Sequence, residues 1–165
     1  MKVARFEKVS KAQFEEDIRE LLGRGDVSYE DIVLPKRATS GSAGYDFTIP
    51  FDILIPKGTF MKIPTGIRCQ IEEGYVLHLY PRSSLGFKYR MALANTTGII
   101  DSDYYGAKNE GHIIAGIVNN GEKDLVLHKG DRFIQGVFLA YYLAEEEEVD
   151  AVRTGGFGSS DLMRP

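Results

Sequence analysis

A chain of 165 residues, 43% of them apolar and 27% charged, is long enough for one domain with a buried core. Its net charge of -4 excludes an overall basic field that would recruit nucleic acid, and its single cysteine excludes an internal disulfide and a thiolate zinc cluster. No apolar run approaches the roughly 20 residues that span a bilayer, and the N-terminus lacks a signal-peptide pattern. We therefore expect a soluble, cytoplasmic protein without nucleic-acid or membrane partners.

The first predicted element is a short amphipathic helix near the N-terminus. Ser10 and Gln13 form an S-x-x-Q capping box, and Gly23 supplies a C-terminal stop. A helix of about three turns is not stable alone in water, so it must pack against another part of the chain. We assign residues 1–31 to an N-terminal helical extension. Its apolar face consists of Phe14, Ile18, Leu21 and Leu22.

From Ile32 onward, apolar residues alternate with polar ones, which is typical of β-strands. Eighteen Gly and six Pro fit many tight turns between short strands. This pattern predicts an all-β sandwich or barrel over residues 32–144. Residues 145–165 are predicted to form an acidic linker and a flexible Gly-rich tail, which becomes ordered when it binds a ligand or a neighbour. The clearest strands are 67–71, 75–79, 113–118, 125–127 and 133–142.

The segment 95–106 combines two carboxylates, Asp101 and Asp103, with an aromatic pair, Tyr104 and Tyr105. In an extended segment, side chains at positions i and i+2 share one face. Two carboxylates on one face beside aromatic rings indicate a site where the carboxylates bind a cation or a polar substrate.

Four further polar, Gly-bearing motifs accompany this segment, and each alone has an ordinary structural interpretation. They are a turn with an edge strand at 43–47, a helix start after Pro81, a hairpin turn at 130–135 and a plain tail at 153–160. None matches a Walker A loop or a dinucleotide fingerprint. The chain also lacks an H-x-E with C-x-x-C pattern, which excludes zinc deaminase chemistry.

Taken in this order, the five motifs resemble those of the trimeric, all-β dUTP pyrophosphatases (dUTPases), over about residues 32–160. The resemblance implies a distorted jelly-roll-like β-barrel that self-associates as a homotrimer, with sites built from three chains. It also implies hydrolysis of dUTP to dUMP and pyrophosphate with Mg²⁺. The N-terminal helix lies outside the resemblance.

The resemblance gives the central segment defined roles. Asp101 would position and activate the attacking water, and Asp103 would be a structural hydrogen-bond acceptor. Tyr104 would pack on deoxyribose and leave no room for a 2′-hydroxyl. Asn95 and the backbone from Gly98 to Ile100, as part of a β-hairpin, would line the uracil pocket and recognise the base.

The other motifs would bind the triphosphate. Arg82 offers a fork of donors that suits phosphate oxygens, and Asp46 would lie near metal-bound waters. Mg²⁺ binds mainly phosphates and waters, which explains why the sequence carries no metal-ligand cluster. The remaining phosphate contacts would come from Ser83, Ser84 and Gln135. In the tail, Arg153 would reach the γ-phosphate and Phe157 would stack on uracil, while Gly158, Ser159 and Ser160 would close on phosphate oxygens.

The chain departs from the family pattern at two places. Residues 107–111 form an apparent insertion after Gly106, which should lengthen a loop near the site or a subunit contact, and Asp161 stands where the family usually has Gly. Two alternatives stay open at this point. One is a dCTP deaminase-like nucleotide enzyme. The other is a dUTP-binding regulator of the phage type, whose protein partner could dock on the insertion or the helix.

Overall fold

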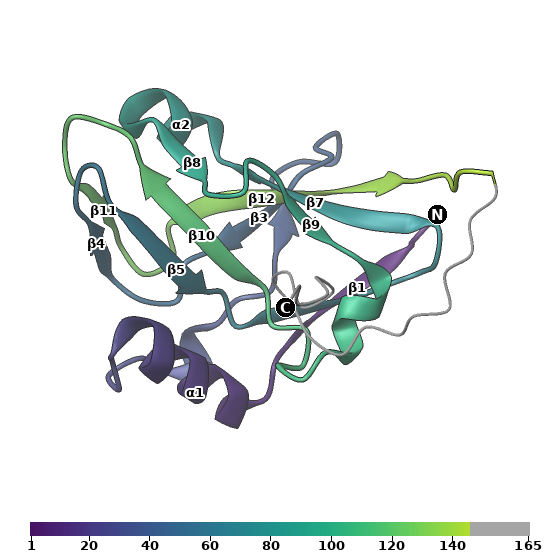
Figure 1. Cartoon of the computed structure of the whole chain (residues 1–165), viewed down its shortest axis with the longest axis horizontal. Helices are drawn as coiled ribbons and strands as arrows, with labels where there is room; N and C mark the ends of the chain where they lie inside the picture. The colour runs from purple at the N-terminus through teal and green to yellow at the C-terminus, as the bar shows by residue number, and fades with distance from the viewer. Residues whose placement is uncertain (146–165) are drawn as a thin grey trace, which may run out of the picture.

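The computed structural model describes residues 1–145, and these residues fold mainly into short strands (Figure 1). The largest sheet has five strands in the order β2-β3-β12-β7-β9. The central strand β12 pairs antiparallel with β7 on one side and with β3 on the other, so Gln135 lies opposite both Tyr80 and Asp46. The strands of this sheet are β2 (Lys36–Arg37), β3 (Tyr45–Thr48), β7 (Tyr75–Pro81), β9 (Gly98–Ile100) and β12 (Arg132–Ala140).

Three smaller sheets complete the β structure. One has the order β5-β10-β8, and the other two are the antiparallel pairs β11-β4 and β1-β6. The prediction of an all-β, jelly-roll-like fold is confirmed, but in residues 1–145 the strands form four separate sheets and not a closed barrel. These strands are β1 (Ala4–Lys8), β4 (Ile53–Ile55), β5 (Phe60–Pro64), β6 (Ile67–Ile71), β8 (Met91–Leu93), β10 (Ile114–Asn119) and β11 (Leu125–Leu127).

The sheets enclose one hydrophobic core. The alternation at Ile67, Cys69 and Ile71 is confirmed, because these three side chains are buried while Gln70 is exposed. Phe133, at the start of β12, is fully buried. Truncating a buried Phe costs about 3–5 kcal/mol, so the core strongly fixes the strand that carries Gln135.

The predicted N-terminal helix is present as α1 (Lys11–Leu22), and its Phe14 and Ile18 enter the core. Ser10 accepts a hydrogen bond from the Gln13 N–H at 3.2 Å, and Gly23 adopts the left-handed conformation at the C-terminus. The second half of the capping box differs from the prediction. The Gln13 side chain donates to Asp17 at 3.0 Å, and the Ser10 N–H donates instead to Glu110 at 2.7 Å.

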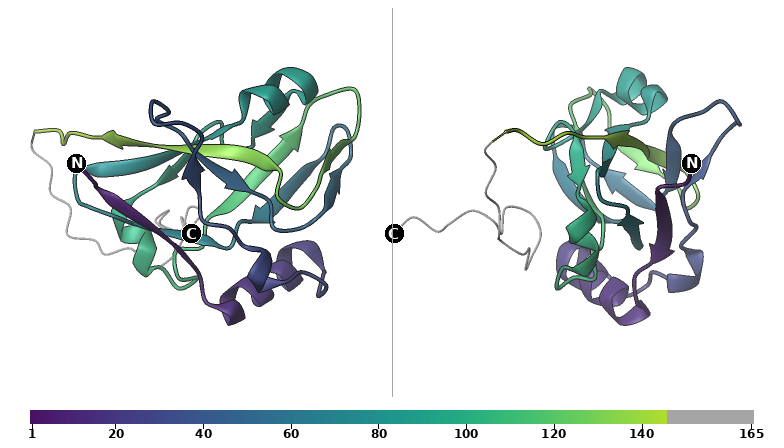
Figure 2. Two further views of the ribbon diagram at one scale, coloured as in Figure 1. Left: turned by 180° about the vertical axis from the view of Figure 1, so that it is seen from behind. Right: turned by 90° about the vertical axis from the view of Figure 1, so that its right-hand side faces the viewer.

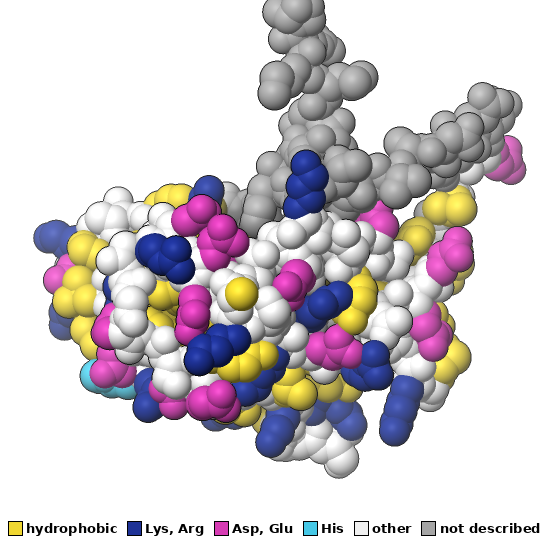
Figure 3. Space-filling view, turned by 90° about the horizontal axis from the view of Figure 1, so that it is seen from below, with side chains coloured by type: hydrophobic (Ala, Val, Ile, Leu, Met, Phe, Trp, Pro, Cys, Tyr) yellow, Lys and Arg dark blue, Asp and Glu magenta, His cyan; other side chains and the backbone are white. Residues whose placement is uncertain are grey.

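The remaining regular elements in residues 1–145 are short helices. Figures 1 and 2 show α1 along one edge of the molecule, and Figure 3 shows acidic and basic side chains interspersed over the face seen from below. None of the helices in residues 1–145 is both long and apolar enough to cross a membrane. Besides α1 they are η1 (Tyr29–Asp31), α2 (Ser83–Tyr89) and η2 (Ser102–Gly106).

Candidate active site

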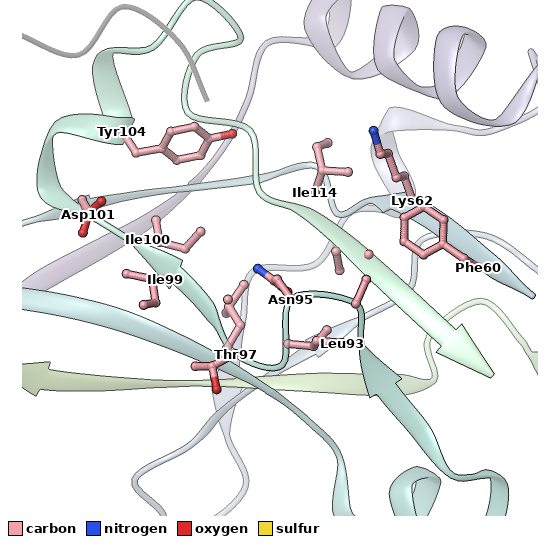
Figure 4. A pocket seen from close by; sticks show the side chains of 15 residues that line it. Phe60, Lys62, Leu93, Asn95, Thr97, Ile99, Ile100, Asp101, Tyr104 and Ile114 are labelled. Atoms are coloured by element: carbon pink, nitrogen blue, oxygen red, sulfur yellow. The ribbon is translucent and has the colours of Figure 1, made fainter. Parts of the chain in front are cut away.

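A cavity of about 370 Å³ lies between the connection from β8 to η2 and the strands β5 and β10 (Figure 4). Its volume is within the range of roughly 300–1,000 Å³ that is usual for small-molecule sites. The walls are mainly apolar, with a carboxylate and an amide at separate points. The cavity wall contains the predicted catalytic residue Asp101 and the predicted nucleoside-binding residues Asn95, Gly98, Ile100 and Tyr104, together with Phe60, Lys62, Thr97, Ile99 and Ile114.

The connection from β8 to β9 forms one wall of this cavity, and it is not the β-hairpin that we expected. β8 pairs with β10, whereas β9 pairs with β7 in the larger sheet. Thr96 adopts a left-handed conformation with a φ of 67°, and the Thr97 N–H donates to Asn95 O at 2.7 Å. This tight turn carries the chain from one sheet to the other. Gly98 must be small, because an added Cβ would lie 3.0 Å from the Leu79 side chain.

The two carboxylates of the central segment point into different surroundings. The sequence predicted an extended segment, but Asp101 precedes the 3₁₀-helix η2, and Asp103 lies inside it. Because a 3₁₀-helix has three residues per turn, positions i and i+2 do not share a face. Asp101 lines the cavity, whereas Asp103 is exposed and does not line it.

Tyr104 is buried in the wall, with only 6% of its surface exposed. Its hydroxyl donates to the carbonyl oxygen of His112 at 2.7 Å and accepts from the Asn109 side-chain amide at 2.8 Å. Both of these partners lie at or directly after the insertion. Asn109 and His112 were not predicted as site residues, because their contacts with Tyr104 depend on how the insertion folds back onto η2.

The neighbouring Tyr105 fixes η2 through contacts with β1 and β6. The Arg68 guanidinium lies 3.6 Å from the centroid of the Tyr105 ring and donates to the Tyr105 carbonyl at 3.2 Å. The Tyr105 hydroxyl donates to Glu7 at 2.6 Å, and this hydrogen bond raises the pKa of Tyr105. Residues from β1 and β6 therefore hold the helix that follows Asp101.

The predicted phosphate-binding residues form a second group around Asp46. This carboxylate is buried, and it accepts hydrogen bonds from Arg82 and, at 3.2 Å, from Arg132. Gln135 lies opposite Asp46 in the sheet and donates to Pro81 O at 3.4 Å. Arg132 was not singled out from the sequence, although it lies within the motif that contains Gln135.

Among residues 1–145, the predicted phosphate-binding residues do not line the cavity that contains Asp101 and Tyr104. Ser83 and Ser84 are exposed at the start of α2, and the cavity wall includes neither of them, nor Arg82 or Gln135. The predicted tail residues Arg153, Phe157, Gly158, Ser159 and Ser160 lie outside the described residues.

The fold and the site define this chain as a small all-β protein. A carboxylate lies in the wall of its nucleoside-sized cavity, and two arginines form a separate group around Asp46. Comparison with known proteins gives the family. The dUTPase family profile matches residues 30–161, which is most of the chain. The chain belongs to the dUTPase family.

Individual relatives agree with this assignment. The deoxyuridine 5′-triphosphate nucleotidohydrolase of Lactococcus lactis is 40% identical over 132 residues, which cover 78% of this chain and 88% of that protein. The crystal structure of the dUTPase from Streptococcus mutans superposes with a TM-score of 0.68 at 35% identity, over 85% of this chain and 98% of that one. The dUTPase of phage phi11 of S. aureus has a TM-score of 0.66 over 91% of this chain and 97% of that one. At 18% identity it shows the same fold alone.

Proposed function

We propose that this protein hydrolyses dUTP to dUMP and pyrophosphate. The observation that carries the proposal is the cavity wall in which Asp101, Tyr104 and Asn95 lie together. The carboxylate can activate a water, the aromatic ring can pack on a deoxyribose, and the amide can hydrogen-bond a uracil. Relatives at 34–40% identity are named as enzymes of this activity.

Asp101 is the proposed general base. Its carboxylate would accept a proton from the water whose oxygen attacks the α-phosphorus, and the bond from that phosphorus to the pyrophosphate oxygen would break. A carboxylate oxygen that lies within hydrogen-bond reach of the water is able to accept this proton. The exposed Asp103 serves as a structural acceptor in this scheme.

The remaining cavity residues would select the nucleoside. We propose that the Tyr104 ring packs on the deoxyribose and excludes a 2′-hydroxyl. Asn95 and the backbone of Gly98 to Ile100 would hydrogen-bond uracil and reject cytosine. A site built to pair buried polar groups rejects a ligand that leaves them unpaired, often by large factors.

Phosphate binding would fall to the second group. Arg82 and Gln135 would stabilise the negative charge that the phosphates carry in the transition state, together with the backbone and hydroxyl donors of Ser83 and Ser84. The tail residues Arg153, Phe157, Gly158, Ser159 and Ser160 would close over the substrate and exclude water.

The donor set fits a Mg²⁺ ion that arrives with the phosphates. Within residues 1–145, no cluster of three or more His, Cys, Asp or Glu side chains could hold a metal ion. Mg²⁺ needs few protein ligands when it binds phosphates and waters. Asp46 already accepts from two arginines, so we propose that it contacts the metal through water only. When bound, Mg²⁺ supplies positive charge that stabilises the phosphate oxygens.

We also propose that the active form is a homotrimer. The wall of the nucleoside cavity contains none of the proposed phosphate-binding residues among residues 1–145, so we infer that a second copy completes the site. The end of β12 and the residues after it expose large apolar side chains, with Tyr142 93% and Leu143 72% exposed. Exposed apolar surface of this kind favours association with another chain.

The proposal is tested by comparing four nucleotides. We expect pyrophosphate release from dUTP, with release from dCTP, dTTP and UTP lower by about a hundredfold or more. The measurement is a coupled pyrophosphate assay with an ammonia assay in parallel. Ammonia from dCTP would replace the proposal with the deaminase-like alternative, and binding of dUTP without hydrolysis would favour the regulatory alternative.

A substitution at Gly44 tests the proposed role of Gln135 in phosphate binding. An added Cβ would lie 2.6 Å from Gln135 Oε1, the end of a flexible side chain, so alanine would displace that amide without disturbing the backbone. We expect Gly44→Ala to raise the KM for dUTP about tenfold because a phosphate contact is lost.

Gly41→Ala is the matched control, since its Cβ would meet nothing within 4 Å. Equal KM values for the two variants, both folded, would remove Gln135 from the phosphate site.

A further inference from the structure

The insertion at residues 107–111 is hydrogen-bonded both to Tyr104, which lines the cavity, and to the start of the N-terminal helix. It turns back sharply, with Glu110 and Gly111 in the left-handed conformation and the Glu110 N–H donating to Ala107 O at 2.8 Å. Gly111 packs against the backbone of η2, because an added Cβ would lie 2.7 Å from Tyr104 O. The insertion is therefore folded onto η2 rather than extended into solvent.

One end of this insertion holds the Tyr104 hydroxyl. Asn109 donates to that hydroxyl through Nδ2, and its Oδ1 accepts from the Gly111 N–H at 3.2 Å. The hydroxyl in turn donates to the carbonyl of His112. Both hydrogen-bonding functions of the Tyr104 hydroxyl are thus used, which restricts how the ring can move in the cavity wall.

The other end reaches α1 through the His112 side chain, which is fully buried. Nε2 of His112 accepts from the Gly66 N–H at 2.7 Å, so the ring proton is on Nδ1, which donates to Asp17 at 2.5 Å. Burial alone would raise the pKa of Asp17, but the hydrogen bonds from His112 and Gln13 lower it overall. An ionised Asp17 therefore fixes the imidazole from the helix side.

A second contact joins the same two segments. Glu110 accepts from the Ser10 N–H and from the Ser10 hydroxyl, each at 2.7 Å, and so satisfies the first turn of α1 from outside the helix. Asp17 and Ser10 both lie in the part of the chain that precedes the family match at residue 30. The connection between α1 and Tyr104 therefore joins the cavity wall to residues that lie outside the family match.

We propose that Asn109 and the Asp17–His112 pair are positioning residues that hold the Tyr104 ring against the deoxyribose, so that α1 contributes to discrimination between dUTP and UTP. The proposal rests on the proposed function, because it gives Tyr104 the sugar-contacting role. Neither Asp17 nor His112 lines the cavity, but the His112 carbonyl accepts a hydrogen bond from Tyr104, which does, so we expect an effect on selectivity to act through the Tyr104 ring.

The test compares kcat/KM for dUTP and UTP in Asn109→Ala and Asp17→Ala. We expect the ratio of the two values to fall by about tenfold or more in both variants, because a displaced ring leaves room for the 2′-hydroxyl. Asp17→Asn keeps an acceptor for the His112 Nδ1–H, and we expect it to restore most of the ratio. Glu16→Ala, on an exposed position of the same helix, should leave the ratio unchanged.

Ile18→Ala separates positioning from loss of stability. Ile18 is 2% exposed on α1, so its truncation destabilises the helix packing while every hydrogen bond that links Asp17, His112, Asn109 and Tyr104 keeps its donor and acceptor. A loss of selectivity in Ile18→Ala as large as that in Asp17→Ala, at similar melting temperatures, would overturn the proposal. So would an unchanged ratio in folded Asn109→Ala and Asp17→Ala.

Hydrogen exchange in the ligand-free protein tests the connection without any substrate. Faster exchange of residues 102–112 in Asp17→Ala than in Ile18→Ala supports the proposal, and equal exchange in the two variants contradicts it. A wild-type protein that does not hydrolyse dUTP would refute the proposed function. The exchange experiment needs no substrate, so it tests the positioning role independently of that result.

Discussion

Asp101→Asn is expected to lower kcat for dUTP by about 10²–10⁴-fold while dUTP still binds, because an amide cannot accept the proton of the attacking water. The substitution keeps the size of the side chain. Asp101 precedes η2 without capping it through a side-chain hydrogen bond, so the exchange removes no cap from this helix. The measurements are steady-state pyrophosphate release and calorimetric titration with a non-hydrolysable dUTP analogue.

Asp103→Asn is the matched control for this experiment. It makes the same chemical change two residues away, at an exposed position that does not line the cavity. We expect its kcat to remain within a few-fold of the wild type. Similar losses in the two variants would mean that the segment needs negative charge in general, and near-normal turnover of Asp101→Asn would exclude it as the base.

Strands with strong alternation and helices with local caps could be predicted because their signals lie within a few residues. The pattern at Ile67, Cys69 and Ile71 predicts β6, and Ser10 with Gly23 predicts the bounds of α1. β1 was missed, since Arg5, Glu7 and Lys8 are charged residues in a strand whose pairing partner, β6, is distant in the sequence.

The parts of the site that were missed depend on distant contacts. Asp101 is extended as predicted, but the segment that follows it forms η2, which is held by tertiary contacts such as the packing of Arg68 on Tyr105. The motif order was enough to select Asp101, Tyr104 and Asn95, and these residues do share a cavity. The partner of the Ser10 N–H could not be predicted, because Glu110 is 100 positions away.

A mixing experiment tests whether complete sites need more than one chain. Arg82→Gln keeps a donor for Asp46 but loses the charged fork that suits phosphate, so we expect it to be nearly inactive alone, as Asp101→Asn is. If Asp101 and Arg82 in one site come from different copies, unfolding and refolding the two variants together restores activity. In a 1:1 mixture with random assembly, about a quarter of the sites would contain both intact residues.

The control pairs Asp101→Asn with Asn95→Ala, whose lesions lie in the wall of the same cavity. Each cavity is then defective whichever chain supplies it, so this mixture should stay inactive under the same refolding protocol. Recovery in the first mixture alone, with light scattering giving the mass of three chains, is the expected result. No recovery in a refolded trimer would mean that one chain supplies both residues. The separation of Arg82 from the cavity wall would then have to be closed by movement within the chain.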